Sequence, residues 1–180
     1  MDNFSNFRTL CVMKQKIFSA AADTLKDSEL RPLYDLWDSR RGERFLPDRK
    51  DFQFRDFQPW FGRIAVGSIP ASGQHICFDL VGTEITKWDG LDMTGQIFSF
   101  SPGSPTLQLI VAPYLHAYKT QKPTVSVSFK SNTQGELTRL VLPCSHDGVS
   151  VNKQIVAFSL NPAFKALFKK GSLLDLMTPG

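Results

Sequence analysis

The chain has 180 residues, of which 42% are hydrophobic and 15 are Phe, so it is long enough for one domain with a sizeable apolar core. Its 21 Lys and Arg against 17 Asp and Glu give a net charge of only +4, and these charges are scattered, which argues against a nucleic-acid-binding surface. Three widely spaced Cys residues and the lack of any apolar run of ~20 residues exclude a disulfide scaffold and a membrane span, and favour a cytoplasmic protein.

The N-terminal part predicts two helices. Apolar residues at three- and four-residue steps predict an amphipathic helix from about residue 4 to 25. Its stripe comprises Phe7, Leu10, Cys11, Ile17, Phe18, Ala21 and Leu25. A second helix is expected from Ser28, as its N-cap, to a stop at Gly42, with Pro32 in its first turn. The charged, aromatic segment that follows is expected to be connecting structure, with a helical turn near residues 56–61.

From residue 64 the hydrophobic period changes to that of strands. Residues 64–71 and 75–82 flank Ser72-Gly73-Gln74 and predict a hairpin. Short turns and helices follow, and a longer helix is expected from Ser104 to about Gln121. Three strands are then predicted, at residues 124–131, 137–144 and 151–160. In the first of them Val125, Val127 and Phe129 alternate with Ser126, Ser128 and Lys130, which predicts one buried face and one face in solvent.

Three glycines, Gly82, Gly90 and Gly95, lie close together in the sequence and raise the question of a phosphate-binding loop. They match neither G-x-G-x-x-G between a strand and a long helix nor G-K-[ST]. We therefore interpret them as turn residues, with Thr83 capping a short helix that Gly90 ends.

Several short motifs in a fixed order resemble those of a bacterial PAS-like family of single-domain sensory proteins. The matching residues are Trp37; Arg41-Gly42; Pro47, Arg49 and Asp51; Leu80-Val81-Gly82-Thr83; Gly90, Asp92 and Thr94-Gly95; and Leu142-Pro143, Ser145 and Asp147-Gly148. The match covers residues 30 to 158. Asp79 stands where the family more often has Arg, and Cys144 where Leu is usual, so any shared role of the Asp79 position is in doubt.

The order of the elements predicts an α+β fold with an antiparallel sheet. The resemblance implies a PAS-like five-stranded sheet of order 2-1-5-4-3, with helices on one face. We expect an N-terminal helical extension (1–27), a PAS-like domain (28–165) and a C-terminal tail (166–180) that is a short helix or a frayed end.

A PAS fold can enclose a ligand between its sheet and its helices, and the resemblance implies where the wall would lie. The candidate wall residues are Trp88, Met93, Phe98, Tyr114, Tyr118, Phe129, Leu140, Leu142 and Phe158. Core packing is the alternative role for each of them.

Other candidate sites are weaker. His116 lies on the helix that carries the haem ligand in some PAS domains, but its phase opposes the apolar stripe, so no haem is expected. A metal site from His75, Cys77, Cys144 and His146 would need strands that lie ~14 Å apart to share one ion. Residues 144–147, Cys-Ser-His-Asp, adjoin in one turn, which disfavours a nucleophile and base pair. Arg49 and Asp51 are expected to form a structural salt bridge or cap.

We therefore expect a non-catalytic sensory domain that binds a small molecule or a protein and acts through a signalling partner. One alternative is a small α+β isomerase or dehydratase, which would need a buried Asp/His pair. Another is a dimerisation module. A homodimer is expected through the first helix, in which Leu10, Ile17 and Phe18 would be buried between two chains, with docking onto its own sheet as the alternative.

Overall fold

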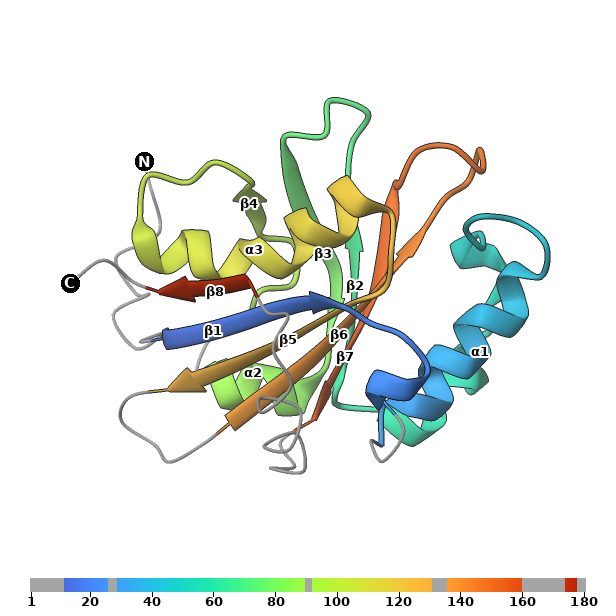
Figure 1. The fold of residues 1–180 in the computed structure, drawn as a ribbon, viewed down its shortest axis with the longest axis horizontal. Helices are drawn as coiled ribbons and strands as arrows, with labels where there is room; N and C mark the ends of the chain where they lie inside the picture. Colours follow the sequence, from blue (N-terminus) through green and yellow to red (C-terminus); the bar gives the residue numbers. More distant parts are fainter. Residues whose placement is uncertain (1–11, 26–28, 90–91, 131–135, 160–173, 178–180) are drawn as a thin grey trace.

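The computed structural model describes residues 12–25, 29–89, 92–130, 136–159 and 174–177, and Figure 1 shows how their helices and strands are arranged. The strands are β1 (Val12–Ser19), β2 (Ile64–Ser68), β3 (His75–Val81), β4 (Ile97–Ser99), β5 (Thr124–Lys130), β6 (Glu136–Cys144), β7 (Lys153–Ser159) and β8 (Leu174–Met177). The α-helices are α1 (Arg31–Arg41), α2 (Thr83–Asp89) and α3 (Pro105–Thr120). Short 3₁₀ helices form at Asp23–Leu25, Arg49–Asp51 and Phe54–Trp60.

The described strands form one sheet in the order β4-β3-β2-β7-β6-β5-β1-β8. Every neighbouring pair is antiparallel. The sheet is curled, and α3 crosses in front of its strands in Figure 1. Strands β7 and β6 lie in the middle of this order, and β7 pairs with β2 on one side and with β6 on the other.

The expected five-stranded PAS-like sheet is wrong. The five strands predicted from the sequence lie inside the sheet in the order β3-β2-β7-β6-β5, but three further strands extend it. Strand β4 pairs with β3, and β1 and β8 extend the sheet beyond β5. A strand at an open edge has unpaired N–H and C=O groups, and these additional strands satisfy them by hydrogen bonding.

The predicted N-terminal helix is also wrong. Residues Val12–Ser19 form β1, in which Ile17 lies opposite Ser126 and is buried in the sheet. The three- and four-residue spacing was compatible with a helix, but pairing with the β5 edge decides the conformation. Phe7, Leu10 and Cys11 lie outside the described residues. Ile17 therefore cannot take part in the expected dimer contact, because it is buried within the chain's own sheet.

The C-terminal tail was expected to be a short helix or a frayed end, and this is wrong for its described part. Leu174–Met177 form β8, which pairs antiparallel with β1. Strands from the predicted N-terminal extension and from the predicted tail thus belong to the same sheet as the strands of the predicted domain.

Most of the other predicted elements are confirmed. Helix α1 ends at Gly42, whose φ of 55° is the left-handed conformation that a C-terminal glycine provides. Strands β2 and β3 form the predicted hairpin, and α3 begins at Pro105 as expected. The predicted cap Ser28 lies outside the described residues, and Ser104 precedes α3 without a side-chain hydrogen bond to the helix.

Both faces of the central strands are buried, in contrast to the expectation of helices on one face. All residues of β7 except Lys153 are buried. Helix α3 covers one face, as the contacts below establish. The segment before β2 supplies large side chains to the core. These are Leu25, Leu30, Leu33, Trp37, Leu46, Phe52, Phe57 and Trp60.

Gly82 and Gly95 have different roles in the structure. Gly90 lies outside the described residues. Gly95 has a φ of +75°, as the turn interpretation requires. Gly82 has no positive φ, but a Cβ atom there would lie 2.2 Å from the carbonyl oxygen of Gly62. Gly82 is therefore required for the close approach of two backbone segments.

We predict that Gly82→Ala destabilises the protein more than Gly95→Ala does. The Gly82 variant has to displace backbone atoms, at a cost of about 1–3 kcal/mol, whereas the strained φ at Gly95 costs about 1 kcal/mol. Gly103, which has no atom within 4 Å of its Cβ position, is the matched control. Urea denaturation measures all three variants. Equal midpoints for Gly82→Ala and Gly103→Ala would contradict the packing role.

Candidate functional site

A layer of polar side chains lies on one face of four neighbouring strands. Side chains directly opposite each other on paired strands share a face. Ser126 of β5 is opposite Arg139 of β6, and Gln15 of β1 is opposite Ser128. Gln154 of β7 is opposite Pro143, which is four residues after Arg139 and therefore on the same face. We call Gln15, Ser126, Ser128, Arg139 and Gln154 the polar layer.

Helix α3 covers the polar layer. The ring of Tyr114 lies against the Arg139 guanidinium, and the Tyr114 carbonyl oxygen accepts a hydrogen bond of 2.9 Å from Gln154 Nε2. Further along the helix, His116 Nδ1 lies 2.9 Å from Thr124 Oγ1. Thr124 is on the same face of β5 as Ser126. These contacts place the layer between the sheet and α3, away from solvent.

Arg139 is a charged side chain in this buried layer. It is only 6% exposed. Its guanidinium carbon lies 5.2 Å from the ring centres of both Tyr114 and Phe158. Tyr114 in turn packs edge-on against Phe78, with ring centres 5.3 Å apart. Nε and Nη1 of Arg139 are buried and have no hydrogen-bond partner in the described part of the chain.

The two aromatic contacts offset only part of the cost of this burial. Removing a charged group from water costs several kcal/mol, and a guanidinium does not lose its proton to avoid that cost. A desolvated cation–π contact contributes ~2 kcal/mol. Each unsatisfied buried donor adds a penalty of about 1–3 kcal/mol. An acceptor with negative charge would offset the rest of this cost.

Other atoms of the polar layer also have no hydrogen-bond partner among the described residues. They are Ser126 Oγ, Gln15 Oε1 and Gln154 Oε1. Gln15 Nε2 does donate to Ser128 Oγ at 3.0 Å. Buried polar atoms in native proteins are almost always satisfied by protein, water or ligand. Ser126 lies directly opposite Arg139 in the register, so the unpartnered atoms of these two residues mark a candidate binding site, whereas Gln15 and Gln154 lie further away in the layer.

The predicted wall residues are only partly brought together. Tyr114 and Phe158 contact Arg139, as described above. Phe98 packs edge-on against Phe78, and the half-buried Tyr118 stacks on Phe100. Met93 is buried in the same apolar core. Trp88 belongs to α2 and Phe129 to β5, and their side chains lie outside the described part of the structure.

Leu140 and Leu142 do not belong to the α3-covered face. They alternate with Arg139 and Val141 along β6, so their fully buried side chains lie on the opposite face of the sheet. Both belong to the hydrophobic core.

His116 lies on α3 near the polar layer. The side chain is half-buried, and burial lowers its pKa. Because Nδ1 contacts Thr124 Oγ1, the ring is held against the start of β5. No group of three His, Cys, Asp or Glu side chains in the described ranges could hold a metal ion. Strands β3 and β6, which carry Cys77 and Cys144, are separated by β2 and β7.

The four consecutive candidate residues 144–147, at the end of β6 and in the turn after it, have different partners. Cys144 is buried, which raises the pKa of its thiol, and Sγ lies 3.9 Å from the Leu142 carbonyl oxygen. Ser145 donates to Asp147 at 2.8 Å. The ring of His146 contacts Asp48 instead. The expectation that no nucleophile and base converge here agrees with these contacts.

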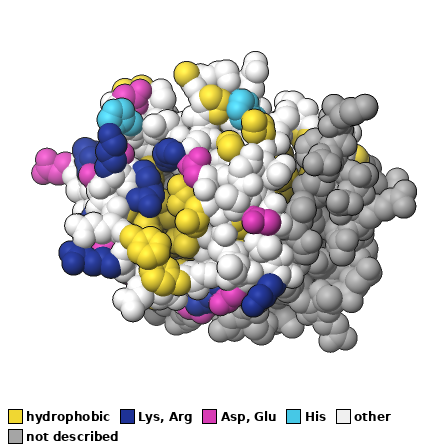
Figure 2. Space-filling view, turned by 180° about the vertical axis from the view of Figure 1, so that it is seen from behind, with side chains coloured by type: hydrophobic (Ala, Val, Ile, Leu, Met, Phe, Trp, Pro, Cys, Tyr) yellow, Lys and Arg dark blue, Asp and Glu magenta, His cyan; other side chains and the backbone are white. Residues whose placement is uncertain are grey.

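Exposed hydrophobic side chains form a second feature of the surface. Figure 2 shows hydrophobic side chains gathered on the face opposite to the view of Figure 1, with Lys and Arg beside them. Phe54 and Phe61 are both exposed and stack with ring centres 4.6 Å apart. Exposed apolar side chains are normal on folded domains and do not by themselves define a site.

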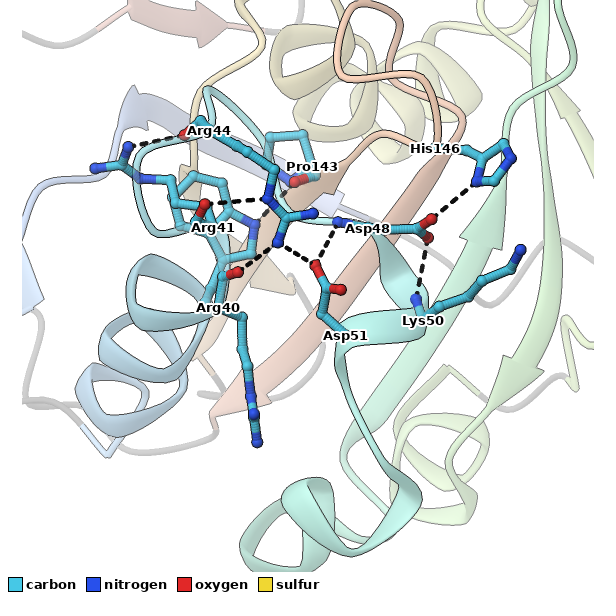
Figure 3. A network of polar contacts seen from close by, with 9 residues as sticks. Arg40, Arg41, Arg44, Asp48, Lys50, Asp51, Pro143 and His146 are labelled. Atoms are coloured by element: carbon cyan, nitrogen blue, oxygen red, sulfur yellow. Dashed lines mark hydrogen bonds and ion pairs between the residues drawn. The ribbon is translucent and has the colours of Figure 1, made fainter.

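A polar network ties the end of α1 to the sheet (Figure 3). Arg44 pairs with Asp51 at 2.5 Å, and Asp51 and Asp48 cap the 3₁₀ helix between them through a reciprocal capping box. Asp48 also contacts His146 at 2.8 Å, and this contact is the main cause of the lowered pKa of the Asp48 carboxyl group. The prediction that Asp51 forms a cap is confirmed, although its ion-pair partner is Arg44.

Arg49 has a separate packing role. Its guanidinium lies 5.0 Å from the Phe57 ring centre, and Nη1 donates to the Phe52 carbonyl oxygen at 3.0 Å. The networks around Asp51 and Arg49 are structural, because each charged group in them has a partner.

Asp79, the residue that departs from the resembled family, is also paired. Its carboxylate accepts hydrogen bonds from Lys153 Nζ at 2.6 Å and from Ser68 Oγ at 2.5 Å, and Lys153 also donates to Ser68. These three residues lie on neighbouring strands β2, β3 and β7. The acidic residue therefore forms a cross-strand ion pair, which is a surface feature of the sheet.

Comparison with known protein families, curated proteins and solved structures finds no match to this chain. Among the described helices, none combines the length and the apolar character needed to cross a membrane. The candidate site is thus defined by the geometry of its own residues.

Sequence reasoning missed the central residues of the site. Ser126 and Ser128 were assigned to a solvent face, but both are buried. Arg139 and Gln154 were not considered as site residues. The available signal was a single charged residue in a mostly apolar predicted strand, since such a residue has to be either at an edge or partnered.

The carboxylate of Asp147 generates a prediction on pH dependence. Backbone N–H groups of Ser150 and Val149, together with the Ser145 hydroxyl, lower its pKa from 3.8 to about 2. A lowered pKa in the folded state stabilises the fold above pH 3.8, and this contribution disappears as the pH falls through about 2.

We therefore predict that Asp147→Asn lowers the Tm at pH 7 and that the difference from the wild type narrows below pH 3.8. Thermal melts followed by circular dichroism at about pH 7, 4 and 3 measure this difference in Tm. A Tm difference that stays constant across this range would show that the charge of Asp147 does not stabilise the turn.

Proposed function

We propose that this protein is a non-catalytic ligand-binding domain with a sensory role, and that a small molecule binds at the polar layer beneath α3. The observation that carries the proposal is Arg139: a guanidinium 6% exposed, with two buried donor atoms unpartnered among the described residues. A bound acceptor would satisfy these atoms and balance the charge.

The position of the site supports a sensory role. Tyr114 contacts Arg139 through its ring and Gln154 through its carbonyl oxygen, so a ligand at the layer would act directly on α3. Binding that favours one position of this helix would change the surface that α3 presents to a partner.

The alternative of a small isomerase or dehydratase has less support. Such an enzyme would need a buried Asp/His pair. The buried polar side chains in the described ranges are Gln15, Thr124, Ser126, Ser128, Thr138, Arg139, Ser145, Gln154 and Ser159. This set contains no acidic residue and no histidine that could transfer a proton.

The sensory proposal includes a signalling partner and a cytoplasmic location. The scattered charges argue against nucleic acid as that partner. A homodimer remains compatible with the proposal, but the dimer interface would have to be formed by residues other than the buried Ile17.

Native mass spectrometry of the full chain purified from its own host tests the proposal. We predict that the wild type retains a small molecule that is released on denaturation, and that Arg139→Met loses it. Replacing a buried, incompletely paired charge by an apolar side chain is neutral or stabilising, so the variant should also melt at the same temperature as the ligand-free wild type or higher.

Arg55→Met is the matched control, because Arg55 is exposed and lies away from the polar layer in sequence and fold. It should retain the small molecule. A wild-type mass equal to that of the chain alone, together with a strong loss of stability in Arg139→Met, would contradict the proposal, because Arg139 would then have a structural partner.

A further inference from the structure

We infer that the ligand at Arg139 is a small apolar monocarboxylate; this inference rests on the proposed ligand-binding function and adds the chemical class of the ligand. It follows from the charge of the site, the shape of its donor group and the side chains beside it.

The charge of the site is a single positive charge. Arg139 is the only charged residue among the buried side chains of the described ranges. A monoanion would neutralise it, whereas a phosphate group, with a charge between −1 and −2 at neutral pH, would leave negative charge buried without a partner. The layer therefore favours a carboxylate over a phosphate.

The donor groups also suit a carboxylate. A guanidinium donates in its own plane and binds the planar carboxylate group with charge-assisted hydrogen bonds. The rings of Tyr114 and Phe158 contact the guanidinium, while its Nε and Nη1 donors have no described partner. The hydroxyl of Ser126, which is opposite Arg139 in the register and also unpartnered among described residues, can donate to the same carboxylate.

Apart from Ser126 and the two rings, three neighbours of Arg139 on this face are apolar. Leu137 and Val141 precede and follow it along β6, and Ile17 lies across Ser126 on β1. All three are buried. An apolar substituent on the carboxylate would contact these side chains, whereas a strongly polar one would be desolvated without partners.

Isothermal titration and thermal melts of the full chain with hexanoate, butyrate, hexanol and inorganic phosphate test the inference. Hexanoate should bind saturably and raise the Tm. Butyrate should bind more weakly, by about fourfold for each CH₂ group removed. Hexanol, which has the same chain without the charge, and inorganic phosphate should give no shift at the same concentration.

Three substitutions test whether hexanoate binds at the polar layer. Arg139→Met should weaken hexanoate binding by at least about tenfold, since a charge-assisted pair is lost, while Arg55→Met should bind it like the wild type. Ser126→Ala should weaken it several-fold and gives a second readout if the Arg139 variant does not fold.

Three outcomes would overturn the carboxylate class: phosphate binding more tightly than hexanoate, hexanol binding as tightly as hexanoate, or wild-type hexanoate affinity in both Arg139→Met and Ser126→Ala. If native mass spectrometry finds an uncharged compound that is lost in Arg139→Met, the inference fails and the proposed function stands. If no compound is retained and no probe binds, both fail.

Discussion

The burial of one guanidinium is the constraint on which the α3-covered half of the molecule depends. Arg139 extends from the middle of β6 into a space bounded by the rings of Tyr114 and Phe158. Because a charge in this position needs both aromatic contacts and hydrogen-bond acceptors, the surrounding positions hold aromatic and polar side chains. The position of α3 follows, since Tyr114 and Gln154 connect the helix to the sheet around the same group.

Strand β1, which lies next to β5 in the sheet, makes this burial possible. Without β1, the polar face of β5 with Ser126 and Ser128 would lie at an open edge of the sheet. Strand β1 pairs along the length of β5 and adds Gln15 and Ile17 to the same face. Packing and hydrogen bonding thus act together: one strand satisfies the backbone of its neighbour and encloses the side chains that form the candidate site.

Most of the local helices and strands could be predicted from the sequence. The strands that extend the sheet beyond its five predicted strands could not. Helix α1, the β2–β3 hairpin, α3 and the last three long strands follow from hydrophobic period, glycine and proline, which act over a few residues. Strand β1 does not, because its conformation depends on a partner more than 100 residues away: Gln15 bonds Ser128 at a separation of 113 residues. Mistaking β1 for a helix left β5 as an edge strand, so Ser126 and Ser128 were assigned to solvent.

The same cause explains which site residues were found. Tyr114 and Phe158 were predicted as wall residues because the PAS-like resemblance implies a cavity between the sheet and its helices, and both lie on elements that would border it. Arg139 and Gln154 were missed because a polar residue in a strand normally indicates an exposed face, and only the three-dimensional arrangement shows that α3 covers them. Leu140 and Leu142 were included because apolar type does not reveal which face of a doubly buried strand a residue occupies.

A high-resolution crystal structure of the protein purified from its own host would show directly what lies beside Arg139. We predict a non-protein anion within hydrogen-bond distance of the guanidinium donors. An Asp or Glu side chain of the protein itself paired with Nε or Nη1 of Arg139, or water as their only partner, would contradict it.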